Sequence, residues 1–379
     1  MTKADAETLT LRSEVRSDGT LELSLKAAPL PRPGPEEIVV EIEATPLHPA
    51  DIGLLLGPAD LLSGERTGAG TDSKIVFKIP NDRLSSVAQR RGKSLPVGNE
   101  GAGVVTAAGD NQKRLLGKTV AIMGGGMLSR HRLVTASDAL LLPDGIAPSR
   151  GAAALINPLT LLTMIETMRQ EGHSGLVHTA AASSLGQMLN RVCLQAGIPL
   201  VNVVRRPEQA SLLIAQGASF VCDTSSETFV EDLGNNVAAT RATLAFDALG
   251  GGVLAGQILT AMERACGADA TEFSRYGSTI HKQIYFYGGL DPRPTQLDRS
   301  YGMAWSVGGW LIFDKLKRMD PGIFEAMKVR IASELESTFS TKFRAEISLT
   351  DLMRKEYFEA FAQRSTGEKY LVNPKLSLE

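Results

Sequence analysis

The pattern of apolar and polar positions changes near residue 150 of the chain. Before that point, short apolar runs are separated by Gly- and Pro-rich turns, and residues 37–44 alternate apolar and acidic side chains as a half-buried strand does. Further strands are predicted at 97–108 and 119–123. These regularly spaced short strands predict a largely β domain. Residues 57–96 lack apolar periodicity, so we interpret them as a long loop or a small insertion.

After residue 150, strand-like runs alternate with segments of helical length. The predicted strands are 176–179, 200–204, 220–222, 244–247 and 284–287, and the predicted helices are 187–196, 207–216 and 253–264. This alternation is typical of parallel βαβ units, which form an open, doubly wound sheet. The sequence therefore predicts an α/β protein in which a β-rich domain is combined with a Rossmann-type parallel-sheet domain.

A third pattern begins near residue 320. It predicts a helix at 323–336, a strand at 343–347, a second helix at 352–363 and a last strand near Tyr370. Neither an internal repeat nor a low-complexity tract interrupts the sequence. The predicted division of the chain is therefore 1–151, 152–318 and 319–379.

Composition narrows the class of protein. The chain has 379 residues, and its 40 Lys and Arg residues nearly balance its 42 Asp and Glu residues. A nucleic-acid binder normally carries a clustered excess of basic residues, so this balance argues against that class. Three cysteines far apart in the sequence support neither a disulfide framework nor a Cys-rich zinc lobe. Without a long apolar span or an apolar stretch at the charged N-terminus, the sequence predicts a soluble cytoplasmic protein with no membrane partner.

The sharpest local signal lies where a predicted strand of the second domain runs into a helix. Residues 175–187 read GLVHTAAASSLGQ, an apolar strand followed by small residues. Small side chains let backbone N–H groups approach a pyrophosphate, and the helix N-terminus adds positive potential. The residues predicted to contact a dinucleotide are Ala181, Ser183, Ser184, Leu185 and Gly186. Because Ala and Ser replace the first glycines of the usual G-x-G-x-x-G, an ordinary strand–helix turn is the alternative.

The end of the next predicted strand bears on the choice of cofactor. Arg205 falls 19 residues after Gly186 and is followed by Arg206. An Asp or Glu at this place binds the ribose hydroxyls of NAD, whereas arginine suits the 2′-phosphate of NADP. The sequence therefore favours NADPH over NADH, with a solvated pair of arginines as the alternative.

Five short motifs follow one another in a specific order. They are ATPLHPAD at 44–51, VGNEGAGV at 97–104, NPLT at 157–160, TAAASSLGQ at 179–187 and GGWL at 308–311. In this order they resemble the medium-chain dehydrogenase/reductase superfamily, in particular its zinc-free quinone oxidoreductases and enoyl-thioester reductases. The resemblance implies a GroES-like catalytic β domain, an inserted Rossmann domain, a C-terminal segment that returns to the first domain, and a homodimer.

The metal-binding positions of that superfamily are altered in this chain. Zinc-dependent members hold the metal with a Cys, a His and a further ligand, but here the Cys position reads His48 and the His position reads Asn99. Catalytic zinc usually takes three protein ligands, so the sequence predicts no metal. Without zinc to stabilise an alkoxide, the chemistry that fits is hydride transfer to a quinone or to an activated C=C of an enone or enal.

Two other functions stay open. The enoyl-thioester reductases are expected to use a tyrosine shortly after the first motif as proton donor, and this chain has Ala59 at that position. A 2-enoyl-thioester reductase with a replaced proton donor is therefore one alternative. A catalytically weak NADPH-binding protein is the other.

His48 is the residue predicted to be catalytic, because its motif position directs it towards the nicotinamide and an imidazole donates protons near neutral pH. The alternative is a hydrogen bond to the backbone in the turn before Pro49. The predicted substrate pocket contains His48, Asn99, Tyr301 and Trp305, although 301–313 also resembles an edge strand in a dimer interface. Further residues are predicted by family position to contact the cofactor: Asn157, which is also a candidate N-cap, Thr160, Asp247, Ala248, Tyr287, Gly288 and Gly289.

Overall fold

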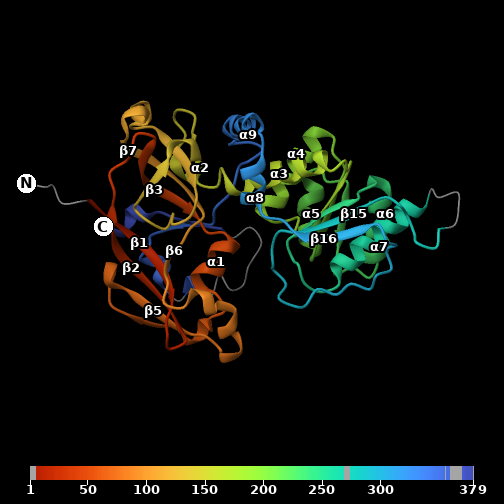
Figure 1. The fold of residues 1–379 in the computed structure, drawn as a ribbon, viewed down its shortest axis with the longest axis horizontal. Helices are drawn as coiled ribbons and strands as arrows, with labels where there is room; N and C mark the ends of the chain where they lie inside the picture. Colours follow the sequence, from red (N-terminus) through yellow and green to blue (C-terminus); the bar gives the residue numbers. More distant parts are fainter. Residues whose placement is uncertain (1–5, 269–273, 355, 359–368, 379) are drawn as a thin grey trace, which may run out of the picture. The chain divides into compact units, whose positions relative to one another are not determined.

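The chain forms two compact units in a computed structural model that describes residues 6–268, 274–354, 356–358 and 369–378 (Figure 1). One unit combines Met1–Ile156 with Lys328–Glu379, and the other is Asn157–Met327. The predicted boundaries at 151/152 and 318/319 lie a few residues before the observed ones. The first unit is therefore made from two separate stretches of the chain.

A five-stranded sheet occupies part of the first unit. Its strands, in spatial order, are β4 (Glu65–Thr67), β5 (Lys74–Lys78), β2 (Thr20–Leu30), β1 (Ala6–Val15) and β6 (Ser94–Pro96). The segment 57–96 that we interpreted as a loop thus supplies three strands to this sheet, and its remainder includes the 3-10 helix Asn81–Arg90. Of the two alternatives, the long loop is wrong, because β5 pairs with β2 from far earlier in the sequence, which no local periodicity reveals.

The second sheet of this unit joins its two stretches of chain. The order is β10 (Ala139–Leu141), β8 (Thr119–Met123), β7 (Glu100–Ala108), β3 (Glu37–Pro46), β18 (Tyr370–Val372) and β17 (Ala345–Ile347), with β9 (His131–Thr135) also paired to β3. β18 runs antiparallel to β3 and places Leu371 opposite Pro46. The last strand therefore begins beside the segment that follows β3.

Short helices cover parts of the first unit, and one further helix spans its boundary. They are α1 (Pro49–Leu56), α2 (Pro148–Gly151) and α9 (Pro321–Ser333). Half of the predicted helix 352–363 lies outside the described residues; in the described half, the 3-10 turn Asp351–Met353 is followed by helical residues at 356–358. The core includes Phe77 and Phe358, whose rings meet edge to face with centroids 5.4 Å apart.

The second unit is a parallel sheet with helices between its strands. The strand order is β13 (Phe220–Asp223), β12 (Leu200–Val204), β11 (Leu176–Thr179), β14 (Leu244–Asp247), β15 (Lys282–Phe286) and β16 (Trp305–Gly309). All of these neighbours pair in parallel. The order reverses at β11, which is the topological switch point of a Rossmann fold. The predicted fold class is confirmed.

The helices of this unit are α3 (Ile156–Gln170), α4 (Ser184–Ala196), α5 (Pro207–Ala215), α6 (Phe229–Thr240), α7 (Leu254–Gly267) and α8 (Ile312–Arg318). The sequence did not predict α6. Its buried positions Phe229, Leu233 and Val237 follow helical spacing, but Gly234 and the adjacent asparagines weaken the signal in that segment.

By length and composition alone, the segment Pro148–Gln170 is apolar enough to cross a membrane. In the folded chain, 89% of its most apolar window is buried inside the protein. Burial of this kind is found in the core helices of globular proteins as well.

Candidate active site

The turn between β11 and α4 has the geometry of an anion-binding site. Ala180 has a φ of 50°, and the Ser183 side chain accepts a hydrogen bond from Gly186 N–H at 3.1 Å, so Ser183 is the N-cap of α4. A Cβ on Gly186 would lie 2.2 Å from the carbonyl oxygen of Ala181. Only glycine lets the helix start this close to the strand, and its N-terminus lies at the carboxyl end of the sheet.

The neighbouring strand β12 ends in Arg205 and Arg206, and both side chains are exposed. Arg205 N–H donates to Gln209 Oε1 at 3.1 Å, and Arg206 occupies the N-cap position of α5. The carboxylate at the end of the next strand, Asp223, accepts from the backbone and hydroxyl of Ser225. The side chains offered to solvent directly after β12 are therefore cationic.

Asp247 closes β14 and is fully buried. Its Oδ1 accepts from Thr179 Oγ1 at 2.6 Å and from Leu249 N–H at 2.9 Å, and its Oδ2 accepts from Gly250 N–H at 3.1 Å. Ala248 N–H in turn donates to Thr179 Oγ1 at 2.8 Å. These bonds hold the ends of β11 and β14 together. The contacts of Asp247 in the structure are therefore with Thr179 and with the turn that follows β14.

Tyr287, Gly288 and Gly289 follow β15. The Tyr287 hydroxyl lies 2.8 Å from His178 Nε2, with the two rings stacked 5.8 Å apart. Burial lowers the pKa of His178 to about 3, so this imidazole is neutral, and burial raises the pKa of the Tyr287 hydroxyl. A phenol with a raised pKa is a poor acid, so we interpret Tyr287 as part of a wall. Gly288 approaches Ala248 so closely that a Cβ would lie 2.6 Å from that residue's carbonyl oxygen.

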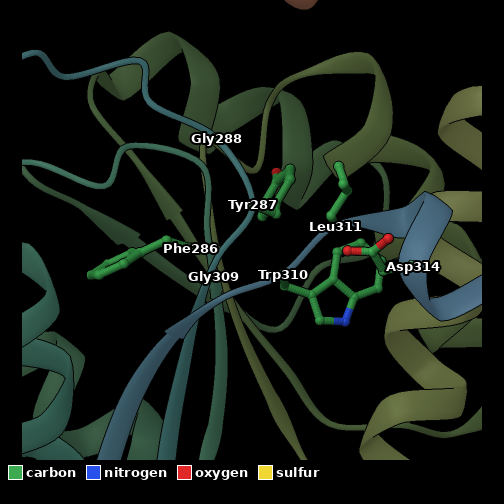
Figure 2. Close-up of a pocket in the computed structure, with 7 residues that line it drawn as sticks. All are labelled: Phe286, Tyr287, Gly288, Gly309, Trp310, Leu311 and Asp314. Atoms are coloured by element: carbon green, nitrogen blue, oxygen red, sulfur yellow. The ribbon is translucent and has the colours of Figure 1, made fainter.

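An open pocket of about 550 Å³ lies at the carboxyl ends of β15 and β16 (Figure 2). It is lined by Phe286, Tyr287, Gly288, Gly309, Trp310, Leu311 and Asp314. The Trp310 indole N–H donates to Thr167 Oγ1 at 3.3 Å, which fixes the ring. Ligands of open parallel sheets bind at this end of the strands. The lining residues from Gly309 onwards were not predicted as site residues, although the motif at 308–311 includes three of them.

Tyr301 and Trp305 do not line that pocket. Tyr301 is fully buried in the core of its unit and meets Trp305 edge to face, with centroids 4.9 Å apart. The Trp305 indole N–H donates to Gly302 O at 3.2 Å. Trp305 begins β16, the edge strand of the sheet. The predicted edge strand is therefore seen at Trp305–Gly309, and the dimer interface stays a prediction.

Asn157 and Thr160 both lie in the first turns of α3 and are buried. α3 begins at Ile156, so Asn157 lies inside the helix and the N-cap interpretation is wrong. Its Nδ2 donates to Ser184 Oγ at 3.4 Å. This bond links α3 to the first turn of α4, beside the predicted pyrophosphate site.

In the other unit, His48 belongs to a buried polar cluster. It is the N-cap of α1 and only 5% exposed, and its N–H donates to Asp51 Oδ2 at 2.9 Å. His48 Nε2 lies 2.6 Å from Glu100 Oε1. The imidazole therefore bonds to a carboxylate. Burial raises the pKa of Asp51 to about 6, against the opposing effect of His48.

Glu100 is the centre of this cluster and is 1% exposed. Its Oε2 accepts from Leu155 N–H at 2.9 Å and from Ile156 N–H at 2.8 Å, at the start of α3. Its other carboxylate oxygen, Oε1, bonds to His48 Nε2. The adjacent Asn99 is half-buried, and its carbonyl accepts from Gly124 N–H at 3.1 Å.

Lys369, which sequence reasoning missed, lies directly before β18. Its Nζ is buried and has no hydrogen-bond partner among the residues that the structure describes. Burial lowers the pKa of Lys369 to about 8, while the charges of Glu100 and Asp51 oppose that decrease. No local pattern distinguishes this lysine in the sequence, because its neighbours are brought together only by the pairing of β18 with β3.

The possible metal-ligating side chains of the described residues lie apart from one another. Within residues 6–268, 274–354, 356–358 and 369–378 there is no group of three or more His, Cys, Asp or Glu that could hold an ion. His48 Nε2 is already engaged by Glu100. Ala59, at the position of the expected tyrosine, is 9% exposed and packs in the core of its unit.

Comparison with known proteins supports the same architecture. No family model matches the chain. It is 28% identical over 325 residues to the mitochondrial enoyl-[acyl-carrier-protein] reductase of Xenopus tropicalis, covering 81% of this chain and 78% of that protein. Among solved structures, a putative NADPH:quinone reductase from Mesorhizobium loti matches with a TM-score of 0.72 and 21% identity, over 99% of this chain and 100% of that one.

A second solved structure is the complex of Etr1p with NADP and crotonyl-CoA. It matches with a TM-score of 0.67 and 18% identity, over 97% of this chain and 100% of that chain. The likeness extends over both units of the fold. The predicted resemblance to quinone and enoyl-thioester reductases of the medium-chain superfamily is confirmed.

Proposed function

We propose that this protein is a medium-chain-type reductase that uses NADPH to reduce a quinone or the activated C=C of an enone or enal. The observation that carries the proposal is the carboxyl edge of the parallel sheet. There the capped turn at Ser183 and Gly186 is followed, one strand over, by the exposed pair Arg205 and Arg206. Its similarity to NADPH:quinone and enoyl reductases supports the same function.

The residues present fit NADPH. Backbone N–H groups at the start of α4, with Ser183 and Ser184, suit a pyrophosphate. Arg205 and Arg206 suit the 2′-phosphate, which a carboxylate would repel. Bound NADPH would supply a hydride. The pocket beyond β15 and β16 offers Tyr287 and Trp310 as walls near the reacting end.

His48 is proposed to assist protonation of the substrate. Addition of a hydride to the electron-poor carbon pushes a pair of electrons onto the conjugated oxygen, and a proton then completes the C–H or O–H bond. The proton held in the hydrogen bond between His48 Nε2 and Glu100 Oε1 would meet this need, directly or through water. Solvent would then restore it.

Zinc independence is part of the proposal, because of the chemistry of the donor set. The family's Cys position is an imidazole that already bonds to Glu100, and its His position is the amide of Asn99. Polarisation of the substrate oxygen would therefore come from hydrogen bonds.

One alternative is favoured by a specific observation. The similarity to the Xenopus mitochondrial enoyl reductase extends over most of both chains, which favours a 2-enoyl thioester as substrate. With Ala59 in place of the expected tyrosine, the His48 and Glu100 pair would be the replacement proton source.

We also propose a cytoplasmic homodimer in which two copies pair through the outer edge of β16, which pairs with no strand but β15 among the described residues. Analytical ultracentrifugation of the wild type and of Val307→Pro tests this assembly. We expect a dimer that the proline converts to a monomer. A wild-type monomer would contradict it.

The test of the activity is a panel of quinones, enones, enals and enoyl-CoA thioesters with NADPH and NADH side by side. We expect turnover of at least one acceptor, with NADPH preferred. Tight NADPH binding without turnover of any acceptor would contradict the proposal and favour a catalytically weak NADPH-binding protein.

A further inference from the structure

The two aromatic walls of the pocket at the carboxyl ends of β15 and β16 are each fixed through their polar atom (Figure 2). The Tyr287 hydroxyl bonds to His178 Nε2 at 2.8 Å, and His178 is fully buried. The Trp310 indole N–H donates to Thr167 Oγ1 at 3.3 Å. The Trp310 ring also meets Phe246 edge to face, with centroids 5.5 Å apart. Both walls therefore present ring surface to a ligand, while their polar atoms are engaged inside the protein.

Asp314 supplies the charged side chain of this pocket, among the described residues that line it. It lies in the first turn of α8, and its side chain is 60% exposed. Leu311, at the N-cap of the same helix, is apolar and exposed. Figure 2 shows the Asp314 carboxylate on the Trp310 side of the pocket. A ligand seated against the indole therefore meets two carboxylate oxygens, which accept hydrogen bonds and carry negative charge.

The lysine next to Asp314 in the sequence is engaged elsewhere. Lys315 Nζ lies 3.7 Å from Glu171 Oε1 and 5.4 Å from the centroid of the Tyr285 ring. The Tyr285 hydroxyl donates to the same Glu171 oxygen at 2.8 Å. These contacts join α8 to the end of α3 and to β15. Lys315 is therefore held by an anion of its own.

Two exposed cations complete the charges of α8. Lys317 Nζ lies 3.9 Å from Asp314 Oδ1, and its side chain is 77% exposed. Arg318 ends the helix and is also exposed. Ion pairs between exposed side chains contribute little, because both partners stay solvated and are screened by salt. A ligand in the pocket therefore meets a carboxylate that its neighbours compensate only weakly.

We propose that Asp314 is a specificity-determining residue: its carboxylate makes the pocket favour electron acceptors that carry no negative charge on the part seated against Trp310. The proposal rests on the proposed reductase function, whose acceptor it narrows. Screening limits the reach of the carboxylate to about 10 Å at 0.1 M salt, so a phosphate at the far end of a long acceptor lies outside its influence.

The first experiment uses a matched pair of acceptors, a neutral naphthoquinone and the same naphthoquinone with one sulfonate group. The ratio of their kcat/KM values, sulfonate over neutral, is measured with NADPH for the wild type and Asp314→Asn. We expect this ratio to rise about fivefold in the variant, because one repulsion between like charges is removed. The rise should shrink at about 1 M salt, where the screening length is about 3 Å.

The control for this experiment is Glu231→Gln, which removes an exposed carboxylate from the first turn of another helix, α6. Its ratio should equal that of the wild type. A ratio that is the same in the wild type, Asp314→Asn and Glu231→Gln would overturn the proposal. So would a rise that salt does not reduce, since the effect would then be steric.

A second experiment measures binding without turnover. The chain has two tryptophans, so Trp305→Phe leaves Trp310 as the one indole that emits. This variant is titrated with each naphthoquinone in the presence of NADP+, and quenching of Trp310 fluorescence reports binding. We expect saturable quenching, with a Kd for the sulfonate that falls about fivefold relative to the neutral compound when Asp314→Asn is added. Absence of saturable quenching, or an unchanged ratio of Kd values, would overturn the proposal.

The two experiments separate this proposal from the reductase function. If the wild type reduces no acceptor while the Kd ratio depends on Asp314, the reductase function fails and the charge selection stands. If turnover is robust but neither ratio changes in Asp314→Asn, the role of Asp314 fails and the reductase function stands.

Discussion

The arginine pair of one unit and the Glu100 cluster of the other differ in how far their charged groups are exposed. In Asn157–Met327, the groups proposed to bind a cofactor lie at strand ends, and the cations Arg205 and Arg206 are exposed. In the other unit, the ionisable groups around Glu100 are buried and bonded to one another. An exposed cationic edge suits reversible capture of an anionic ligand. A buried cluster suits a proton, because each charge strongly affects the protonation of its neighbours.

The largest expected effect concerns the backbone turn in the binding unit. In Gly186→Ala, the new Cβ would lie 2.2 Å from Ala181 O, so the turn or the helix must shift. We expect a loss of about 3 kcal/mol in stability and loss of NADPH binding, measured by denaturation and calorimetry. Gly234→Ala, in α6 with nothing near its Cβ, is the control and should be neutral or stabilising. Equal behaviour of the two variants would contradict the close-approach argument.

The second prediction addresses the buried cluster through pH. The pKa of Asp51 is raised to about 6, above its ordinary value of 3.8, so its burial costs nothing at low pH and up to about 3 kcal/mol once it ionises. The stability of Asp51→Asn relative to the wild type should therefore rise between about pH 4 and about pH 7. Asp18→Asn is the exposed control, and there Thr20 lowers the pKa of the carboxyl, so the relative stability should change in the opposite direction. If the free energy of unfolding of Asp51→Asn relative to the wild type did not change with pH, the pKa of this carboxyl would not be raised.

The third prediction separates proton transfer from binding. His48→Gln should lower kcat by about 100-fold with little change in the Kd of NADPH, since general acids contribute factors of this size. The exposed His281, changed to Gln, is the matched control and should keep full activity. If His48→Gln retained kcat and its pH profile, His48 would have no part in protonation.

The smallest expected effect is on cofactor choice. Replacing both Arg205 and Arg206 by Ser should raise the KM for NADPH about tenfold to a hundredfold and leave that for NADH nearly unchanged. Arg264→Ser, another exposed arginine, serves as the control for loss of charge. An unchanged ratio of kcat/KM values for NADPH and NADH would contradict the assignment of the 2′-phosphate site.

The same contrast explains what the sequence could predict. The binding edge is built from contacts close in sequence, such as Ser183 with Gly186, so β11, β12 and β14 were predicted with their observed bounds. The parallel pairing of these strands also follows from the alternation of strand and helix. Arg205 and Arg206 lie where the spacing from Gly186 placed them.

The buried cluster depends instead on pairing over long distances. Glu100 meets residues 155 and 156, and Lys369 approaches His48 only because β18 joins β3. Two of the strands within 57–96 were missed for the same reason, because β5 pairs with β2 and β6 pairs with β1. Local periodicity carries no information about such partners, whereas the resemblance to a family did single out His48.

The most direct test of the central claim follows the hydrogen atoms during turnover. The acceptor selected by the panel, if it is an enone or enoyl thioester, is reduced with NADPH that carries deuterium at C4, in ordinary water. We predict one deuterium on the β-carbon of the product and a hydrogen from solvent on the α-carbon. A product without deuterium from either face of labelled NADPH would contradict hydride transfer and with it the proposed function.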